Sequence, residues 1–226
     1  MTSRVDPGYL RTYLVTDPVL CGARGVLSVI ESAVAGGATT VQIRDKTAGG
    51  RELFELVCRA AELTDGKATL LVNDRVDVYS AAKAVGAAVD GVHLGQEDLP
   101  VAAVRQVIGP DAVIGLSADT QAHLDEVHAL GPGTVDYLGV GAIRETSTKA
   151  DHPAPLGYSG FAQVASATTL PCVAIGGVQS LDTLPLREAG AAGLATVSAI
   201  CAAADPCRAA REFAQAWDAA EAPSGK

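Results

Sequence analysis

Residues 136–149 combine the residue types that are needed to hold a phosphate group. A short apolar run leads through Gly141 into a polar loop that ends Thr146-Ser147-Thr148-Lys149. Glycine lets the backbone approach a ligand closely, hydroxyl groups donate hydrogen bonds, and the lysine adds a positive charge. Because Gly, Ser and Thr are also ordinary loop residues, this segment alone fits a phosphate site and a solvated loop equally well.

Residues 41–46 read Val-Gln-Ile-Arg-Asp-Lys, so that apolar and polar side chains alternate. In a strand, this alternation puts Gln42, Arg44 and Lys46 on one face and the two apolar residues on the other. A buried arginine is costly unless it pairs with a carboxylate or binds an anion. Because perturbed charges cluster at functional sites, the pattern favours an anion site over a structural ion pair with a neighbouring strand.

Two further apolar runs end in acidic residues. Asn73-Asp74 follows the first, and residues 95–98 (Gly-Gln-Glu-Asp) follow the second. Each motif alone is typical of a turn. Together they would place Asp74 and Asp98 at the ends of adjacent strands, where two carboxylates and the oxygens of a diphosphate suit Mg²⁺. Glu97 is the competing candidate for the second ligand.

The remaining strand ends offer small or hydroxyl residues. Ser117 ends one run, Gly176-Gly177 follows another, and Val197-Ser198 ends the last. Loops after strands seven and eight form the frequent phosphate site of (β/α)₈ barrels. His93 lies within a strand, where a hydrogen-bonded core histidine is the more common role. No protein nucleophile stands out, which favours a reaction in which a phosphate leaves and the protein stabilises its charge.

The elements that must position these residues alternate along the chain. Eight strand–helix pairs with short connections predict an α/β fold, a single (β/α)₈ TIM barrel over residues 12–220. A doubly wound sheet is the alternative, because it shows the same alternation. We expect one domain over residues 1–226, with a disordered tail at 221–226. Strands are predicted at 12–16, 39–44, 68–72, 91–94, 112–116, 135–140, 172–175 and 193–198. Helices are predicted at 24–35, 51–64, 76–85, 101–108, 120–130, 158–167, 181–189 and 207–220.

Composition limits the classes of function. The 226 residues are 48% hydrophobic, which is ample for a buried core, and the net charge of −9 argues against a nucleic-acid-binding surface. Five cysteines match no zinc spacing, and neither a signal peptide nor a membrane-spanning run is visible. We therefore expect a cytoplasmic protein with reduced thiols that binds no membrane. The sequence leaves a monomer and a homodimer open.

The strand-end motifs together resemble the thiamine phosphate synthase family, from about Tyr13 to Ala199. The matching segments are YLVTD (13–17), VQIRDK (41–46), VNDR (72–75), GVHLGQED (91–98), GLS (115–117), TSTK (146–149) and AIGG (174–177). The resemblance implies that a hydroxymethylpyrimidine diphosphate and a hydroxyethylthiazole phosphate are joined to give thiamine phosphate and diphosphate. It also implies that the pyrimidine ring expels diphosphate, and that the thiazole nitrogen captures the resulting cation.

The resemblance assigns roles to individual residues of this chain. The residues expected to hold the pyrimidine diphosphate are Gln42, Arg44, Lys46 and Asn73, with Ile43 and Asp45 of the same segment also counted as substrate-binding. Asp74 and Asp98 would bind Mg²⁺, and Ser117 would contact the pyrimidine. The residues expected around the thiazole phosphate are Thr146, Ser147, Thr148, Gly177, Val197 and Ser198, while Lys149 would contact the diphosphate. The catalytic set would be Arg44, Lys46, Ser117 and Lys149.

The chain departs from the family pattern near the first segment described. The family usually has Gly-Pro at 141–142 and an aromatic or apolar residue with Pro at 144–145, whereas this chain has Gly-Ala and Arg-Glu. The usual Ser-Ala-His-Thr is here Ser-Ala-Asp-Thr at 117–120. We hypothesise that Arg144 adds a charge near the diphosphate or pairs with Asp119.

Three other functions fit parts of the pattern. They are a thiazole tautomerase-like isomerase, a non-catalytic barrel that binds a phosphate ligand, and an epimerase that acts on sugar phosphates. A binder of one phosphate needs fewer charges than this chain carries, and an epimerase needs an acid/base pair across its ligand. The presence of both carboxylates and of three cationic residues favours the synthase.

Overall fold

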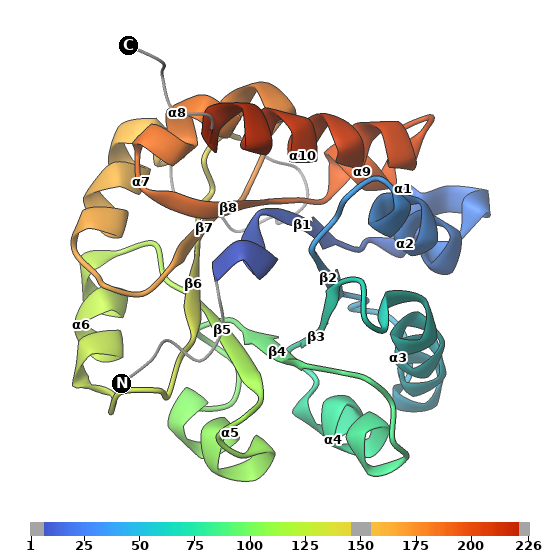
Figure 1. Cartoon of the computed structure of the whole chain (residues 1–226). Coiled ribbons are helices and arrows are strands. Elements are labelled where there is room, and N and C mark those ends of the chain that lie inside the picture. Colours follow the sequence, from blue (N-terminus) through green and yellow to red (C-terminus); the bar gives the residue numbers. More distant parts are fainter. Residues whose placement is uncertain (1–6, 146–154, 222–226) are drawn as a thin grey trace.

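The computed structural model describes residues 7–145 and 155–221, and these form a closed barrel of eight parallel strands (Figure 1). Each strand pairs with the next one along the chain, and the last pairs with the first. The prediction of a (β/α)₈ barrel is confirmed, and the doubly wound alternative is wrong. The strands are β1 (Thr12–Val15), β2 (Thr40–Ile43), β3 (Thr69–Asn73), β4 (Gly91–Leu94), β5 (Val113–Ser117), β6 (Tyr137–Val140), β7 (Cys172–Ala174) and β8 (Ala191–Thr196).

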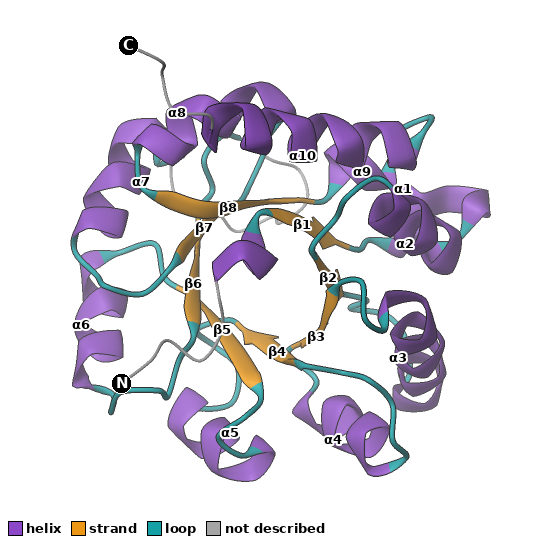
Figure 2. Cartoon of the chain, in the orientation of Figure 1, coloured by secondary structure: helices purple, strands orange, loops and turns teal. Residues whose placement is uncertain are grey.

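Helices surround the barrel as an outer layer (Figure 2). The eight predicted helices are α2 (Val26–Ala35), α3 (Gly50–Thr64), α4 (Val76–Ala84), α5 (Val101–Ile108), α6 (Gln121–Ala129), α7 (Gly157–Ser166), α8 (Thr183–Glu188) and α10 (Pro206–Glu221). The sequence analysis missed the short helices α1 (Pro18–Cys21) and α9 (Ser198–Cys201), together with the 3₁₀ turns η1 (Pro7–Leu10), η2 (Gly22–Arg24) and η3 (Ser180–Asp182).

Two boundaries differ from prediction for local reasons. Asp17-Pro18 does end β1, but it also starts α1, because the Asp17 carboxylate accepts the Leu20 N–H at 3.0 Å and proline suits a first helical turn. The last strand ends at Thr196 rather than at 198, so that Ser198 opens α9. Helix α10 includes Glu221, and the rest of the predicted tail lies outside the described residues, so the single domain over 1–226 stays a prediction.

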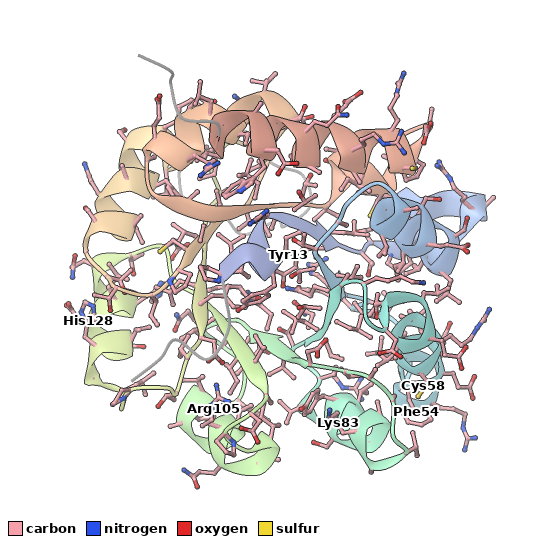
Figure 3. All side chains as sticks on the ribbon, in the orientation of Figure 1. Tyr13, Phe54, Cys58, Lys83, Arg105 and His128 are labelled. Carbon is pink, nitrogen blue, oxygen red and sulfur yellow. The ribbon has the colours of Figure 1, made fainter. Side chains whose placement is uncertain are left out.

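Apolar side chains fill two layers. The larger lies between strands and helices and includes Val41, Ile43 and Val92, which are fully buried. The smaller fills the inside of the barrel and includes Leu10, Tyr13 and Tyr137. Figure 3 places Tyr13 within the ring of strands. The strand ends that carry the predicted site residues are therefore held by a core on both sides, as expected for a parallel sheet.

The described part of the chain was also compared with the requirements for a membrane span. No single helix in residues 7–145 and 155–221 is long and apolar enough to cross a bilayer. One pair, Pro18–Arg24 and Val26–Ala35, meets the length and composition requirement only together, with a bend of 88° between the two.

Candidate active site

The end of β2 presents polar groups to the barrel as the alternation predicted. Gln42 is buried inside the barrel, while Val41 and Ile43 pack in the outer layer. The backbone of Arg44 is fixed by Thr16, whose hydroxyl accepts the Arg44 N–H at 2.9 Å and donates to the Arg44 carbonyl at 3.3 Å. No carboxylate in residues 7–145 and 155–221 lies within ion-pair distance of Arg44, so none of these residues neutralises its charge.

Two other residues of the segment 41–46, Ile43 and Asp45, make contacts within the protein. Ile43 is fully buried in the outer layer, away from the barrel mouth. The Asp45 carboxylate accepts the backbone N–H groups of Thr47 and Ala48 at 2.8 and 3.0 Å, which fixes the turn that follows β2. These hydrogen bonds hold the pKa of Asp45 below its usual value despite partial burial. Ile43 therefore packs in the outer layer and Asp45 stabilises the turn, and their contact with substrate stays a prediction.

Asp74 and Asp98 come together where β3 and β4 end. Asp74 has a left-handed backbone (φ 61°), and its N–H donates to the His93 carbonyl at 2.9 Å. The pKa of Asp74 is raised to about 6, mainly by burial and then by the hydrogen bond and charge of Asp98, while Asn73 and Lys46 oppose the shift. Asp98 is fixed in turn, because its carboxylate accepts the Gly95 N–H at 2.7 Å.

This pair of carboxylates fits a cation. Two acidic groups that share a hydrogen bond repel each other when both are ionised, and a divalent cation relieves that repulsion. No group of three or more His, Cys, Asp or Glu side chains within the described residues could hold a metal by itself. A metal bound to Asp74 and Asp98 would therefore need oxygens from water or from a substrate. Glu97 is exposed and belongs to the same loop.

A chain of hydrogen bonds crosses the inside of the barrel. Gln42 Nε2 donates to the Tyr13 hydroxyl at 2.6 Å, and the Tyr13 and Tyr137 hydroxyls are 2.8 Å apart. The Tyr137 hydroxyl is 2.9 Å from His93 Nδ1, and His93 Nε2 is 3.2 Å from Ser117 Oγ. Burial raises the pKa of Tyr13 and of Tyr137, so that both hydroxyls stay protonated. Two predicted substrate-binding residues, Gln42 and Ser117, are thus joined through three aromatic rings.

The chain of hydrogen bonds has a preferred direction. The Tyr13 hydroxyl already accepts a hydrogen bond from the Gln42 amide. Among the described residues, Tyr137 is the only acceptor for the Tyr13 proton. The Tyr137 hydroxyl is then left to donate to His93 Nδ1. In the tautomer that fits this, the histidine proton is on Nε2 and can be donated to Ser117 Oγ. The Ser117 proton is left for a ligand at the barrel mouth.

His93, Tyr13 and Tyr137 are site residues that the sequence analysis missed. The interpretation of His93 as a hydrogen-bonded core residue is correct as far as it goes, but it overlooked the contact with Ser117. The alternation used for residues 41–46 would have found it, because Val92 and Leu94 pack outward and His93 must then point inward. Gly115 makes room for this ring pair, since a Cβ there would lie 2.2 Å from the Tyr137 ring and 2.5 Å from His93 Nδ1.

The other side of the mouth is built from the segments that follow β6 and β7. Ile143 N–H donates to the Ile175 carbonyl and Arg144 N–H to the Gly176 carbonyl, each at 3.0 Å. Gly176 and Gly177 have φ values of 94° and 68°, and a Cβ on Gly176 would lie 2.6 Å from the Ala142 Cβ. Both the backbone conformation and this close approach require glycine.

Of the predicted phosphate ligands, Gly177 is half-buried beside this segment, Val197 precedes α9, and Ser198 is exposed at its first residue. The four predicted residues Thr146, Ser147, Thr148 and Lys149 lie outside the described residues.

The predicted pairing of Arg144 with Asp119 is wrong, and a role of its charge near the diphosphate stays a prediction. Its guanidinium is bonded to the Asp182 carboxylate and, at 2.9 Å, to the Tyr158 hydroxyl, so its charge is neutralised there. Asp119 pairs instead with His123, whose Nδ1 lies 2.8 Å from its carboxylate. Local sequence patterns do not predict this ion pair, because Arg144 and Asp182 are 38 positions apart and belong to different βα units.

Comparisons with known proteins agree with the strand-end motifs. A family model described as thiamine monophosphate synthase matches residues 12–200. A curated thiamine-phosphate synthase of Azorhizobium caulinodans is 49% identical over 206 residues, which cover 91% of this chain and 93% of that protein. One from a Psychrobacter species is 41% identical over 201 residues, covering 89% and 92%. A solved structure, thiamine phosphate pyrophosphorylase from Pyrococcus furiosus, superposes with a TM-score of 0.82 at 31% identity, covering 95% of this chain and 98% of that one.

Proposed function

The chain belongs to the thiamine monophosphate synthase family and is a transferase with thiamine-phosphate synthase activity, and from this premise we propose how its residues carry out the reaction. The proposed substrates are 4-amino-2-methyl-5-(diphosphooxymethyl)pyrimidine and 4-methyl-5-(2-phosphooxyethyl)thiazole. The curated relatives are named as synthases, which favours this activity over the isomerase, epimerase and binding-protein alternatives.

One observation carries the proposal for the diphosphate half of the site. Asp74 and Asp98 share a hydrogen bond at the mouth, Lys46 is close enough to affect the pKa of Asp74, and Arg44 has no carboxylate partner among the described residues. Two cations that have no ion-pair partner among the described residues, together with paired carboxylates, suit a Mg²⁺–diphosphate group. Asp74 and Asp98 would hold the metal, and Arg44 and Lys46 would bind phosphate oxygens. Bound there, Mg²⁺ would offset part of the negative charge that develops on the departing diphosphate.

The bond changes need no nucleophile from the protein. The bond between the pyrimidine methylene carbon and the diphosphate oxygen breaks, and its electron pair leaves with the diphosphate. The aminopyrimidine ring donates electron density to the methylene carbon, and the lone pair of the thiazole nitrogen then forms the new carbon–nitrogen bond. The task of Arg44, Lys46 and Lys149 is to stabilise the charge on the leaving diphosphate.

The hydrogen-bond chain inside the barrel supports a site for the pyrimidine ring. Gln42 uses its amide N–H on Tyr13, which leaves its carbonyl oxygen to accept from the amino group of the substrate. Ser117 accepts from His93 and keeps its own proton to donate to the ring. An amino group and a ring nitrogen would thus meet an acceptor and a donor of fixed orientation, which holds the methylene carbon in place for attack.

The thiazole phosphate belongs on the opposite side of the mouth. Gly177, Val197 and Ser198 supply backbone N–H groups and a hydroxyl there, and Thr146, Ser147 and Thr148 stay predicted ligands of the same phosphate. We also keep the cytoplasmic location, which is supported by five free cysteines. The homodimer stays an untested prediction, which sedimentation of the purified protein would decide.

The test is product formation from the two proposed substrates with purified protein and Mg²⁺, followed by oxidation of thiamine phosphate to its fluorescent derivative. The expected result is turnover that EDTA abolishes and that added Mg²⁺ restores. Turnover that survives complete chelation would contradict the metal role of Asp74 and Asp98. Absence of turnover, in protein that is folded and binds the thiazole phosphate, would contradict the proposed pair of substrates.

A further inference from the structure

Asp182 is a fully buried carboxylate beside the barrel mouth, in the turn η3 that follows β7. Its Oδ2 accepts the backbone N–H of Gln179 at 2.8 Å. Its Oδ1 accepts from the Tyr158 hydroxyl and from the guanidinium of Arg144. A buried carboxylate is tolerated only when its lone pairs are occupied in this way, so the three partners are held firmly.

These partners come from three separate elements. Arg144 lies in the segment after β6, Tyr158 lies in the first turn of α7, and Asp182 lies between β7 and α8. The two sides of the β6–α7 connection are also tied together, because Leu156 N–H donates to the Ala142 carbonyl at 2.8 Å. Asp182 therefore links both ends of this connection to the exit of β7.

Arg144 and its neighbour Glu145 also pack against Gly177. A Cβ on Gly177 would lie 2.9 Å from the Arg144 Cβ and 3.2 Å from the Glu145 carbonyl oxygen, so the backbone of residues 144–145 packs directly against this glycine. The Arg144 N–H donates to the Gly176 carbonyl at 3.0 Å. A shift of Arg144 would consequently move the Gly176-Gly177 turn.

The charges indicate that this group positions other residues and does not bind substrate itself. The guanidinium of Arg144 is compensated by Asp182, and 43% of its side-chain surface stays exposed. The hydrogen bond to Asp182 raises the pKa of Tyr158, which keeps that hydroxyl protonated and able to donate. The cluster is thus electrically balanced before any ligand arrives.

We propose that Arg144, Tyr158 and Asp182 form a positioning clamp that holds Gly177 in the geometry required by the phosphate of the thiazole substrate. The clamp sets the affinity for that substrate. It leaves the affinity for the pyrimidine diphosphate unchanged, because Arg44, Lys46 and the two acidic residues lie in the segments that follow strands β2–β4. The inference rests on the proposed function, since Gly177 is taken there as a phosphate ligand.

The test is a set of steady-state measurements on Arg144→Met, with KM determined for each substrate at saturation of the other. The expected result is a KM for the thiazole phosphate that is raised roughly tenfold or more, with the other KM within about twofold of the parent. Arg144→Lys should recover most of the loss, because it restores the positive charge beside Asp182. Titration calorimetry with the thiazole phosphate alone should show the same order of affinities.

A matched control is available on the far side of the barrel. Arg105 forms an ion pair with Asp136 at 2.7 Å, and the carboxylate is mostly buried, as in the clamp, although Arg105 is less exposed than Arg144. Arg105→Met should lower the unfolding temperature and leave both KM values unchanged. If Arg144→Met does not fold, Tyr158→Phe removes one hydrogen bond from Asp182 but keeps the ion pair, and its thiazole KM should still rise.

Two results would overturn the clamp while the proposed function stands. One is parent turnover on both substrates with a thiazole KM that does not change in any clamp variant that folds. The other is an equal rise of both KM values, which would indicate general loosening of the barrel. Absence of turnover in the parent protein would instead contradict the proposed function itself.

Discussion

Removal of the Tyr137 hydroxyl tests whether the hydrogen-bond chain inside the barrel is a single coupled unit. Tyr137 is fully buried, and its hydroxyl contacts Tyr13 at 2.8 Å and His93 at 2.9 Å. Tyr137→Phe keeps the ring, which packs edge-on against Tyr13 with centroids 6.1 Å apart, and removes only the oxygen. Among the described residues the Tyr13 proton then has no acceptor, and the contact of Tyr137 with His93 Nδ1 is lost.

The expected loss of stability in Tyr137→Phe follows from these two lost hydrogen bonds. A buried polar group without its partner costs about 1–3 kcal/mol, and rearrangement of the Tyr13 hydroxyl would recover part of it, so we expect destabilisation of about 1–3 kcal/mol in total. For a chain of this length, each kcal/mol lowers the unfolding temperature by roughly 2–4 °C. We expect kcat/KM for the pyrimidine diphosphate to fall by about tenfold as well, because His93, the hydrogen-bond partner of Ser117, loses the Tyr137 hydroxyl that orients its ring.

A double-mutant cycle separates this reasoning from a simple loss of packing. Tyr13→Phe should be destabilising alone, since it also leaves Gln42 Nε2 without an acceptor inside the barrel. Because the second substitution removes a group that the first leaves unpaired, the double variant should be less destabilised than the sum of the two. Chemical denaturation measures all three free energies. Additive effects, or a Tyr137→Phe protein with the parent's stability and kcat/KM, would refute the coupled chain.

Three further predictions concern other parts of the site and core. Asp74→Asn should keep the fold, because asparagine tolerates the φ of 61°. The rise in unfolding temperature caused by Mg²⁺ with diphosphate should disappear in this variant, and an undiminished rise would show that Asp74 does not bind the metal. Gly115→Ala should destabilise by about 1–3 kcal/mol in urea unfolding, since its Cβ would lie 2.2 Å from the Tyr137 ring, and a neutral effect would contradict that close packing. Burial raises the pKa of Cys172 to about 12, so iodoacetamide should label this thiol no faster at pH 9 than at pH 7. Mass spectrometry measures the labelling, and Cys58, which is less buried, should be labelled before Cys172.

The sequence predicted the parts of this protein that depend on local periodicity. The alternation at 41–46 placed Gln42 inside the barrel and Val41 outside, because a strand has a period of two whatever surrounds it. The count of strand–helix pairs predicted the barrel, and the acidic strand ends predicted the approach of Asp74 to Asp98. Each of these inferences needs only a short segment and the rule that parallel strands share one carboxyl end.

What the sequence did not predict depends on how the barrel closes. The contacts of Tyr13 with Tyr137 and of Arg144 with Asp182 join residues 124 and 38 positions apart, and local patterns do not set such registers. Arg144 shows the difference most clearly. Its charge suggested a role near the diphosphate, yet the fold brings it to a fully buried carboxylate that no local pattern distinguishes from a turn residue.

The order of the strands suggests how two anionic substrates share one site. The segments after β2–β4 contain the cationic and carboxylate groups, and β5 ends in Ser117. Strands β6–β8 lead to the glycine turn and Ser198, and they lie on the opposite side of the ring from β2–β4 (Figure 1). A diphosphate on one side and a phosphate on the other would keep the two anions apart, which limits their mutual repulsion. The linkers of both substrates would then point toward the axis, above Gln42 and Ser117, where the methylene carbon and the thiazole nitrogen must meet. The hydrogen-bond chain under that point can orient the pyrimidine ring without supplying a nucleophile, as a reaction driven by the substrate's own electrons requires.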